Sequence, residues 1–294
     1  KAHQTMCFLA FYKKKIYNIT NKERGTNMSD YQKQTVQWVP GHMAKTRRLI
    51  KESLSLVDGV VEIVDARIPL SSRNPELDEI VKNKPRIVLL NKADVANENA
   101  TSKWIEFFRN KGMYALPVDC RTGKGLNKFS NVVKEALAET IERNEAKGMA
   151  GKPLRLMVVG IPNTGKSSFI NRMAGKARAK VADKAGVTRQ QQWFAVGNGI
   201  ELLDTPGVLW PKFDDKSVGD KLAFIGSVKD EVTDLETLSC KLLETLVKVK
   251  QECIGERFKI SDYEDKQGFE ILEMIGKKRG FIMRGGEINY ERAS

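Results

Sequence analysis

The fold of this chain is decided by the stretch Gly160-Ile161-Pro162-Asn163-Thr164-Gly165-Lys166-Ser167-Ser168. An apolar run (154–159) precedes it and a segment with helical spacing follows it, which is the context in which a GxxxxGKS sequence forms a phosphate-binding loop. Gly160 and Gly165 let backbone amides turn toward a phosphate, and the helix N-terminus adds its positive dipole end. Lys166 supplies a charge for the outer phosphates, and the Ser167 hydroxyl can ligate Mg²⁺. The stretch therefore predicts a nucleoside triphosphate site.

A second motif selects the base. Asn91-Lys92-Ala93-Asp94 follows an apolar run (86–90) that reads as a buried strand. The Asp94 carboxylate can accept from both N1–H and the 2-amino group of guanine, a pair of donors that adenine lacks. We expect Asn91 to bridge toward the phosphate loop and the Lys92 stem to lie along the base. The combination predicts GTP as the ligand.

A third run (114–118) leads into Asp119 and Cys120, where GTPases usually have Ser-Ala-Lys and where a backbone amide reaches the guanine oxygen. The side chains differ here, but backbone donation does not depend on them. The predicted GTP-binding residues are Asn91, Lys92, Ala93, Asp94, Asp119, Cys120, Asn163, Thr164, Gly165, Lys166, Ser167, Ser168 and Gly207.

The segment after the phosphate loop supplies the remaining magnesium ligands. Thr188 lies where the first switch of a GTPase is expected and is the candidate ligand there. Residues 193–196 and 200–203 read as a hairpin that delivers Asp204-Thr205-Pro206-Gly207. Asp204 is expected to hold Mg²⁺ through water, and the Gly207 amide to contact the γ-phosphate. The predicted magnesium set is Ser167, Thr188 and Asp204.

The motifs occur in an unusual order. Ordinary GTPases begin with the phosphate loop and end with the guanine motifs, whereas here residues 91–123 precede 160–168 and 204–207. This order indicates a circular permutation of the same α/β sheet, closed by a polar linker at 144–152. The second switch then leads directly into the C-terminal segment. We expect loss of the γ-phosphate to be passed to that segment.

Charge points to a polyanionic partner. The chain carries a formal net charge of +13, of which residues 1–27 contribute +5, so that +8 remains on the rest. Such a balance favours RNA as a partner, although a basic enzyme without one is the alternative. Four scattered cysteines without metal-ligand spacing indicate a reducing, cytosolic compartment. The sequence contains no apolar run of membrane-spanning length.

The chain divides into three parts on sequence grounds. Residues 1–27 read as a disordered extension, with translated leader sequence before Met28 and a mitochondrial presequence as the two interpretations. Residues 28–215 are predicted to form the permuted GTPase domain. Residues 216–294 are predicted to form a smaller, all-helical domain that binds RNA or the ribosome, with apolar stripes in its helices and a basic cluster at 277–279.

Together these motifs resemble the bacterial YlqF/RbgA family of circularly permuted GTPases, which assist late assembly of the large ribosomal subunit. The resemblance covers roughly residues 36–290 and rests on PGHMAK (40–45), DARIPLSSRNP (65–75), NKAD (91–94), GIPNTGKSS (160–168), GVTRQQQW (186–193), DTPGVLWPKF (204–213) and IGKKRG (275–280). It implies a monomeric cytoplasmic GTPase that docks on a large-subunit precursor in its GTP form and is released by hydrolysis. A nucleotide-gated RNA- or protein-binding switch, in which hydrolysis is incidental, is the alternative.

The resemblance also implies a catalytic group. Ras-like proteins place a glutamine after DxxG to orient water, but this chain has Val208, which cannot do so. The family's catalytic histidine matches His42. Asn163 resembles the residue that helps to hold potassium in related GTPases, where the cation would stabilise transition-state charge. The alternatives are that His42 caps a helix and that Asn163 only shapes its loop.

Overall fold

The structure is a computed structural model. It describes the residue ranges 40–81, 83–175, 192–207, 216–227, 234–283 and 287–294. None of the helices in these ranges has the length and apolar character needed to cross a membrane.

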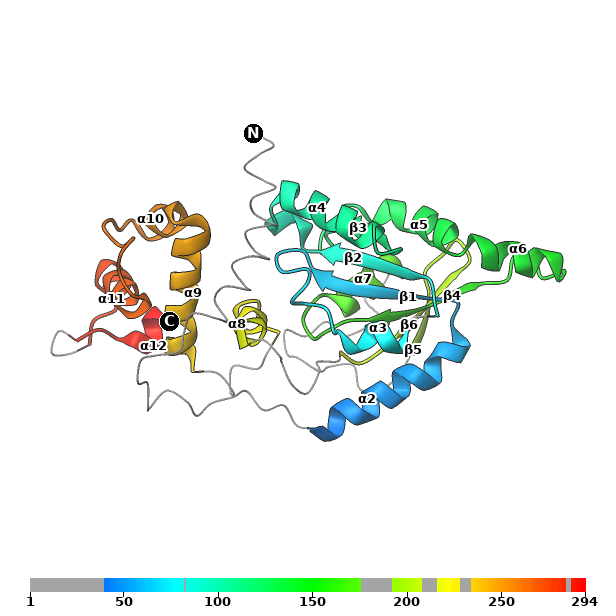
Figure 1. Cartoon of the computed structure of the whole chain (residues 1–294), viewed down its shortest axis with the longest axis horizontal. Helices are drawn as coiled ribbons and strands as arrows, with labels where there is room; N and C mark the ends of the chain where they lie inside the picture. Colours follow the sequence, from blue (N-terminus) through cyan, green and yellow to red (C-terminus); the bar gives the residue numbers. More distant parts are fainter. Residues whose placement is uncertain (1–39, 82, 176–191, 208–215, 228–233, 284–286) are drawn as a thin grey trace. The chain divides into compact units, whose positions relative to one another are not determined.

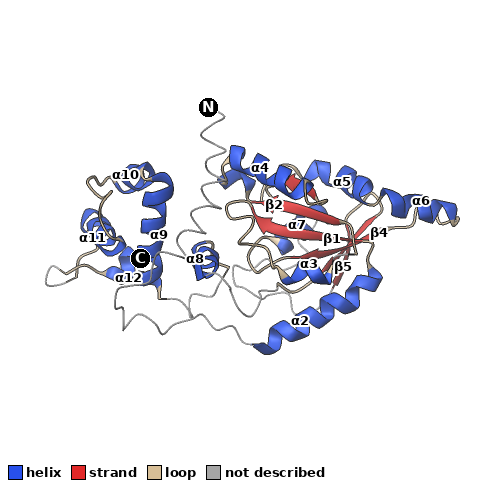
Figure 2. Cartoon of the chain, in the orientation of Figure 1, coloured by secondary structure: helices blue, strands red, loops and turns tan. Residues whose placement is uncertain are grey.

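A six-stranded sheet forms the centre of the first part of the chain (Figures 1 and 2). Its strands are β1 (Gly59–Asp65), β2 (Arg86–Asn91), β3 (Tyr114–Pro117), β4 (Leu154–Val159), β5 (Gln192–Ala195) and β6 (Ile200–Asp204). The order across the sheet is β3-β2-β1-β4-β6-β5, and only the β5–β6 pair is antiparallel among these strands. The strands predicted from the apolar runs 86–90, 114–118 and 154–159 and the predicted hairpin (193–196 and 200–203) are confirmed close to these positions.

The strand order explains how distant motifs meet. β4, which delivers the phosphate loop, lies between β1 and β6, and β2, which delivers NKAD, pairs with β1. Because these strands run parallel, their carboxyl ends share one edge of the sheet, where ligands bind in open α/β folds. The permuted α/β fold predicted from the motif order is confirmed.

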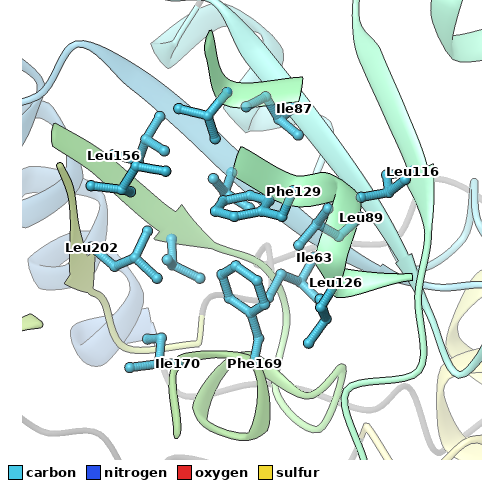
Figure 3. Close-up of a cluster of buried hydrophobic side chains, with 14 of the residues drawn as sticks. Ile63, Ile87, Leu89, Leu116, Leu126, Phe129, Leu156, Phe169, Ile170 and Leu202 are labelled. Carbon is cyan, nitrogen blue, oxygen red and sulfur yellow. The ribbon is translucent and has the colours of Figure 1, made fainter. Parts of the chain in front are cut away.

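Helices cover the sheet on both faces, and its parallel strands are largely buried, whereas the antiparallel edge strand β5 is mostly exposed. The helices are α2 (Pro40–Ser53), α3 (Glu76–Ile80), α4 (Glu98–Arg109), α5 (Phe129–Ala136), α6 (Ala138–Ala146) and α7 (Lys166–Met173). Side chains of β1 alternate between two packing regions. Ile63 joins the cluster around Phe129 and Phe169, whose rings pack edge to face with their centroids 5.1 Å apart (Figure 3). Val64 instead packs with Phe108 of α4.

One helix differs from the sequence prediction. The sequence predicts one helix from Leu126 to about Arg143, but a short 3-10 turn (Leu126–Lys128) is followed by α5 and α6, which are separated at Leu137. Leu137 has non-helical backbone angles (φ −112°, ψ 20°), and its side chain is fully buried. Moreover, α6 extends to Ala146, into the expected linker, because its Glu, Arg and Asn residues are compatible with a solvated helix as well as with a loop.

The C-terminal part has a hydrophobic cluster of its own. Its helices are α8 (Lys216–Phe224), α9 (Leu235–Lys250), α10 (Glu252–Phe258), α11 (Gly268–Arg279) and α12 (Tyr290–Ala293), and a β-bridge joins Ile282 to Ile288. The cluster consists of Leu243, Ile254, Tyr263, Ile271, Leu272 and Ile275. Two members of the expected apolar stripes, Leu235 and Phe269, are exposed instead. The smaller helical domain is confirmed; its predicted boundary at residue 216 stays a prediction.

Candidate functional site

The phosphate loop connects β4 to α7, which begins at Lys166. Gly165 has φ +102°, and a Cβ added to it would lie 2.2 Å from Asn91 Nδ2. A Cβ on Gly160 (φ +151°) would lie 2.5 Å from the Ile63 carbonyl oxygen. Both glycines are therefore required by backbone conformation and by the close approach of neighbouring strand ends.

Lys166 is buried beneath this loop. Its ammonium group donates to the carbonyl oxygens of Gly160 (3.1 Å) and Ile161 (2.8 Å). Burial lowers the pKa of Lys166 to about 8, while the nearby charge of Asp204 acts in the opposite direction. Gly207 packs closely here, since a Cβ on it would lie 2.9 Å from Lys166 Nζ. The DTPG segment thus abuts the lysine that is predicted to contact the outer phosphates.

Asn91 joins the two guanine loops to the phosphate loop. Its Nδ2 donates to the Thr164 carbonyl oxygen at 2.7 Å, and its Oδ1 accepts from the Cys120 backbone N–H at 2.9 Å. The bridge expected from Asn91 to the phosphate loop is present. A backbone amide of the loop at Asp119 and Cys120 is predicted to reach the guanine oxygen; the Cys120 amide is engaged with Asn91 in this structure.

Lys92 makes the second connection. Its backbone is left-handed (φ 62°), and its ammonium group donates to the Asn163 carbonyl oxygen at 3.0 Å. Asn163 is also left-handed (φ 61°). Left-handed backbone is uncommon for residues other than glycine and persists where surrounding contacts hold it. Two such residues facing each other across the guanine and phosphate loops indicate a constrained ligand site.

The carboxylate that is predicted to read the base is partly exposed. Asp94 lies in a short 3-10 turn (Ala93–Val95), and its side chain is 29% exposed and ion-paired with Arg121 at 3.5 Å. Asp119 is bound within its own loop: it accepts from the Arg121 backbone N–H (2.9 Å) and the Thr122 hydroxyl (2.6 Å). Asp119 therefore shapes the loop around Cys120, while the Asp94 carboxylate is partly exposed and pairs with the exposed side chain of Arg121.

The described magnesium candidates are compatible with the ion. Asp204 ends β6 and is buried, and Ser167 is half-buried in the first turn of α7. Carboxylate and hydroxyl oxygens suit Mg²⁺, which in nucleotide sites takes its remaining ligands from water and phosphate. Within the described ranges, no group of three or more His, Cys, Asp or Glu side chains could hold a metal alone. Thr188, the third candidate, lies outside the described residues.

Comparison with known proteins agrees with this geometry. Residues 155–274 match a family model described as 50S ribosome-binding GTPase. The ribosome biogenesis GTPase A of Priestia megaterium is 47% identical over 262 residues, which cover 88% of this chain and 90% of that protein. This chain belongs to the ribosome biogenesis GTPase A family. The Bacillus cereus member is 45% identical over 259 residues, covering 88% and 87% of the two chains.

A solved structure supports the same assignment. The GNP-bound crystal structure of YlqF from Thermotoga maritima aligns with a TM-score of 0.56 at 30% identity. The alignment covers 85% of this chain and 89% of that one. The resemblance to the YlqF/RbgA family inferred from the motifs is therefore confirmed.

His42 and Asn163 are the residues with predicted roles in hydrolysis by this ribosome biogenesis GTPase A family member, and the structure describes the side chain of Asn163 but not that of His42. The backbone of His42 lies in the first turn of α2, but its side chain is outside the described set, as is all of Val208. Asn163 is described, and its amide Nδ2 donates to the Gly226 carbonyl oxygen at 2.5 Å. The amide oxygen is the atom that would ligate potassium. These roles stay predictions.

Sequence reasoning missed two sets of contacts at this family's nucleotide loops. Asp65, at the end of β1, lies 3.1 Å from the Lys92 ammonium group, a contact that the sequence motifs did not predict. The Ser227 hydroxyl, after α8, donates to the Pro162 carbonyl oxygen at 3.1 Å. For the contact between Asp65 and Lys92, the sequence did offer a signal: an Asp at the end of an apolar run that precedes the NKAD strand. No local pattern pointed to the second.

Proposed function

We propose that this chain hydrolyses GTP on a precursor of the large ribosomal subunit and leaves that particle after hydrolysis. Family membership makes it a GTPase that acts in ribosome assembly. The observation that carries the GTP assignment is the bridge from Asn91 to both Thr164 and Cys120, because it brings the guanine-reading loops against the phosphate loop. Asp94 then supplies the carboxylate that distinguishes guanine from adenine.

In this proposal the predicted site residues divide by the part of the nucleotide they serve. Asp94 and Lys92 bind the base, and the loop 160–168 with Lys166 binds the phosphates. Ser167 and Asp204, with Thr188, hold Mg²⁺ directly or through water. Magnesium would offset the charge that develops on the phosphates during transfer.

Asn163 and His42 are assigned to the chemical step. The Asn163 amide oxygen is proposed as a potassium ligand, with its amide nitrogen held by the Gly226 carbonyl. His42 is proposed to orient the attacking water, because Val208 follows DTPG and carries no hydrogen-bonding group. A neutral imidazole carries one unprotonated nitrogen, which can accept a hydrogen bond from the attacking water.

The partner is inferred from names and charge. The matching family model is described as a 50S ribosome-binding GTPase, and the chain carries a formal net charge of +13. A basic protein gains affinity for rRNA by releasing counterions from the phosphate backbone. We propose a monomer that acts in the cytosol and contacts rRNA and ribosomal proteins of the large subunit.

The test is GTP hydrolysis measured alone, with purified large subunits and with small subunits, at several salt concentrations. We expect large subunits to accelerate turnover and small subunits to have little effect, with the stimulation falling as salt rises. Equal turnover with and without large subunits would instead support a nucleotide-gated switch in which hydrolysis is incidental.

A further inference from the structure

Asp65 lies next to the guanine site but belongs to none of the motifs assigned to GTP. It is the last residue of β1, and in the parallel β1–β2 pair it stands opposite Asn91, the first residue of NKAD. Its side chain is fully buried. A buried carboxylate at the ligand-binding edge of the sheet needs donors that offset the cost of its desolvation.

Those donors come from two residues. Arg67 donates to Asp65 Oδ1 through its backbone N–H (3.0 Å) and Nε (2.8 Å), and to Oδ2 through Nη2 (2.7 Å). The Lys92 ammonium group lies 3.1 Å from Oδ2. Burial alone would raise the pKa of Asp65, but the Arg67 hydrogen bond and the charges of Lys92 and Arg67 hold it below its ordinary value. The carboxylate therefore stays ionised at neutral pH.

Lys92 is consequently held at both sides of its ammonium group. Asp65 Oδ2 lies on one side, and the Asn163 carbonyl oxygen of the phosphate loop lies on the other at 3.0 Å. A lysine side chain has a flexible four-carbon stem and loses considerable rotamer freedom when a ligand orders it. A carboxylate that fixes the ammonium group before binding removes part of that cost.

We propose that Asp65 is a positioning residue of the guanine site. By pairing with Lys92, the lysine of NKAD, it holds this ammonium group against the Asn163 carbonyl oxygen in the arrangement that receives the nucleotide. Arg67 in turn fixes the Asp65 carboxylate. The inference rests on the proposed GTP binding and extends the site to a strand end outside its motifs.

A second ion cluster on the same domain offers a matched control. Asp78 accepts from Arg73 Nη2 at 2.7 Å and from Arg86 Nη1, and Arg73 and Arg86 also pair with the buried Glu62 of β1. Within the part of the chain that the structure describes, the side-chain hydrogen bonds and ion pairs of this cluster join its members to one another and not to a residue predicted to bind GTP. Asp78→Asn thus removes a carboxylate from an arginine-bound cluster without changing the contacts of Lys92.

The experiment is a double-mutant cycle on GDP affinity, measured by calorimetric titration. The proteins are the native chain, Asp65→Asn, Lys92→Met and the double variant, with Asp78→Asn as control. We expect Asp65→Asn to weaken GDP binding about tenfold in the native background and less than twofold in the Lys92→Met background. Asp78→Asn should leave the affinity within twofold.

Equal weakening by Asp65→Asn in both backgrounds would overturn the proposal, because the carboxylate would then act independently of Lys92. Unchanged affinity in the native background would overturn it as well. Failure of the native chain to bind GDP would instead refute the proposed function, so the two failures are distinguishable.

A second variant keeps the test decisive if Asp65→Asn does not fold. Arg67→Gln retains the carboxylate and alters a side chain that is 34% exposed. It should weaken GDP binding about threefold, because the carboxylate loses its bidentate partner, and this effect should vanish in the Lys92→Met background. An effect of equal size in both backgrounds would reject the proposal.

Discussion

The base side and the phosphate side of the site are built differently. On the base side, Asn91 and Lys92 donate to carbonyl groups of the phosphate loop, so their bonds connect separate motifs. On the phosphate side, Lys166 donates to Gly160 and Ile161 of its own loop. The first set of bonds can persist when a nucleotide binds. The second set involves the ammonium group that must also serve the phosphates.

This difference assigns nucleotide specificity to the base side of the site and recognition of the phosphate charge to the phosphate side. Contacts that exist before binding reduce the entropy lost on binding, so the base side is preorganised. The Lys166 ammonium group has three N–H donors, of which two are engaged with Gly160 and Ile161, so a phosphate oxygen can take the third donor or replace one of these carbonyl oxygens. We therefore expect changes on the base side to alter which nucleotide binds, and changes on the phosphate side to alter how binding leads to hydrolysis.

The largest effect is expected for Asp94→Asn. Loss of the carboxylate leaves the two guanine donors without their acceptor, so GTP affinity should fall about a thousandfold. Xanthosine triphosphate should bind better than GTP to this variant, because its 2-oxo group suits an amide donor. Parallel titrations of both nucleotides provide the measurement. Native GTP affinity in the variant would show that this edge does not read the base.

His42→Ala should separate binding from chemistry. We expect GTP affinity and docking on the large subunit to match those of the native chain, while subunit-stimulated turnover falls about a hundredfold. Single-turnover hydrolysis with saturating subunits measures the effect, and co-sedimentation with subunits provides the control. Full stimulated turnover in the variant would assign His42 a structural role.

The potassium assignment concerns the phosphate side alone. Hydrolysis should be about tenfold faster in potassium than in sodium at equal ionic strength, because the cation would offset transition-state charge. Asn163→Ala should remove this difference and leave the preference for guanine intact. Steady-state rates in the two salts test both points. Identical native rates in the two salts would exclude the cation site.

The smallest effect is expected on the free energy of unfolding at acidic pH. Burial acts to raise the pKa of Asp65 and Asp119, but hydrogen bonds from Arg67 and Thr122 respectively hold both below the ordinary value. The unfolded chain therefore binds more protons, and this stabilisation is complete above pH ~4 and is lost as pH falls through the folded pKa values. Urea unfolding should show a constant unfolding free energy from pH 7 to 5 and a decline below about pH 4. A flat profile down to pH 3 would contradict it.

Much of the fold followed from local patterns. The apolar runs at 86–90 and 154–159 predicted buried strands, and the motifs at their carboxyl ends predicted where loops would meet. The contact between Asn91 and Thr164 was predictable because it belongs to the motif chemistry. Such features depend on spacing along the chain, which a sequence displays directly.

Other features depend on register and packing, which a sequence does not display. The pairing of Asp65 with Lys92 arises because residue 65 stands opposite residue 91 across two parallel strands. The interruption between α5 and α6 at Leu137 could not be predicted, because neither glycine nor proline occurs there. The roles of His42 and Thr188 stay predictions, since they rest on side chains outside the described set.

The turn after α8 affects where a nucleotide-binding fragment of this chain could end. Ser227 donates to the Pro162 carbonyl oxygen, and the Gly226 carbonyl accepts from Asn163, so residues 226 and 227 complete the outer shell of the phosphate loop. A fragment ending at residue 215 would lose both hydrogen bonds and uncover a carbonyl that Ser227 now satisfies. An expression boundary placed after Ser227 retains them, which makes α8 part of the minimal nucleotide-binding piece.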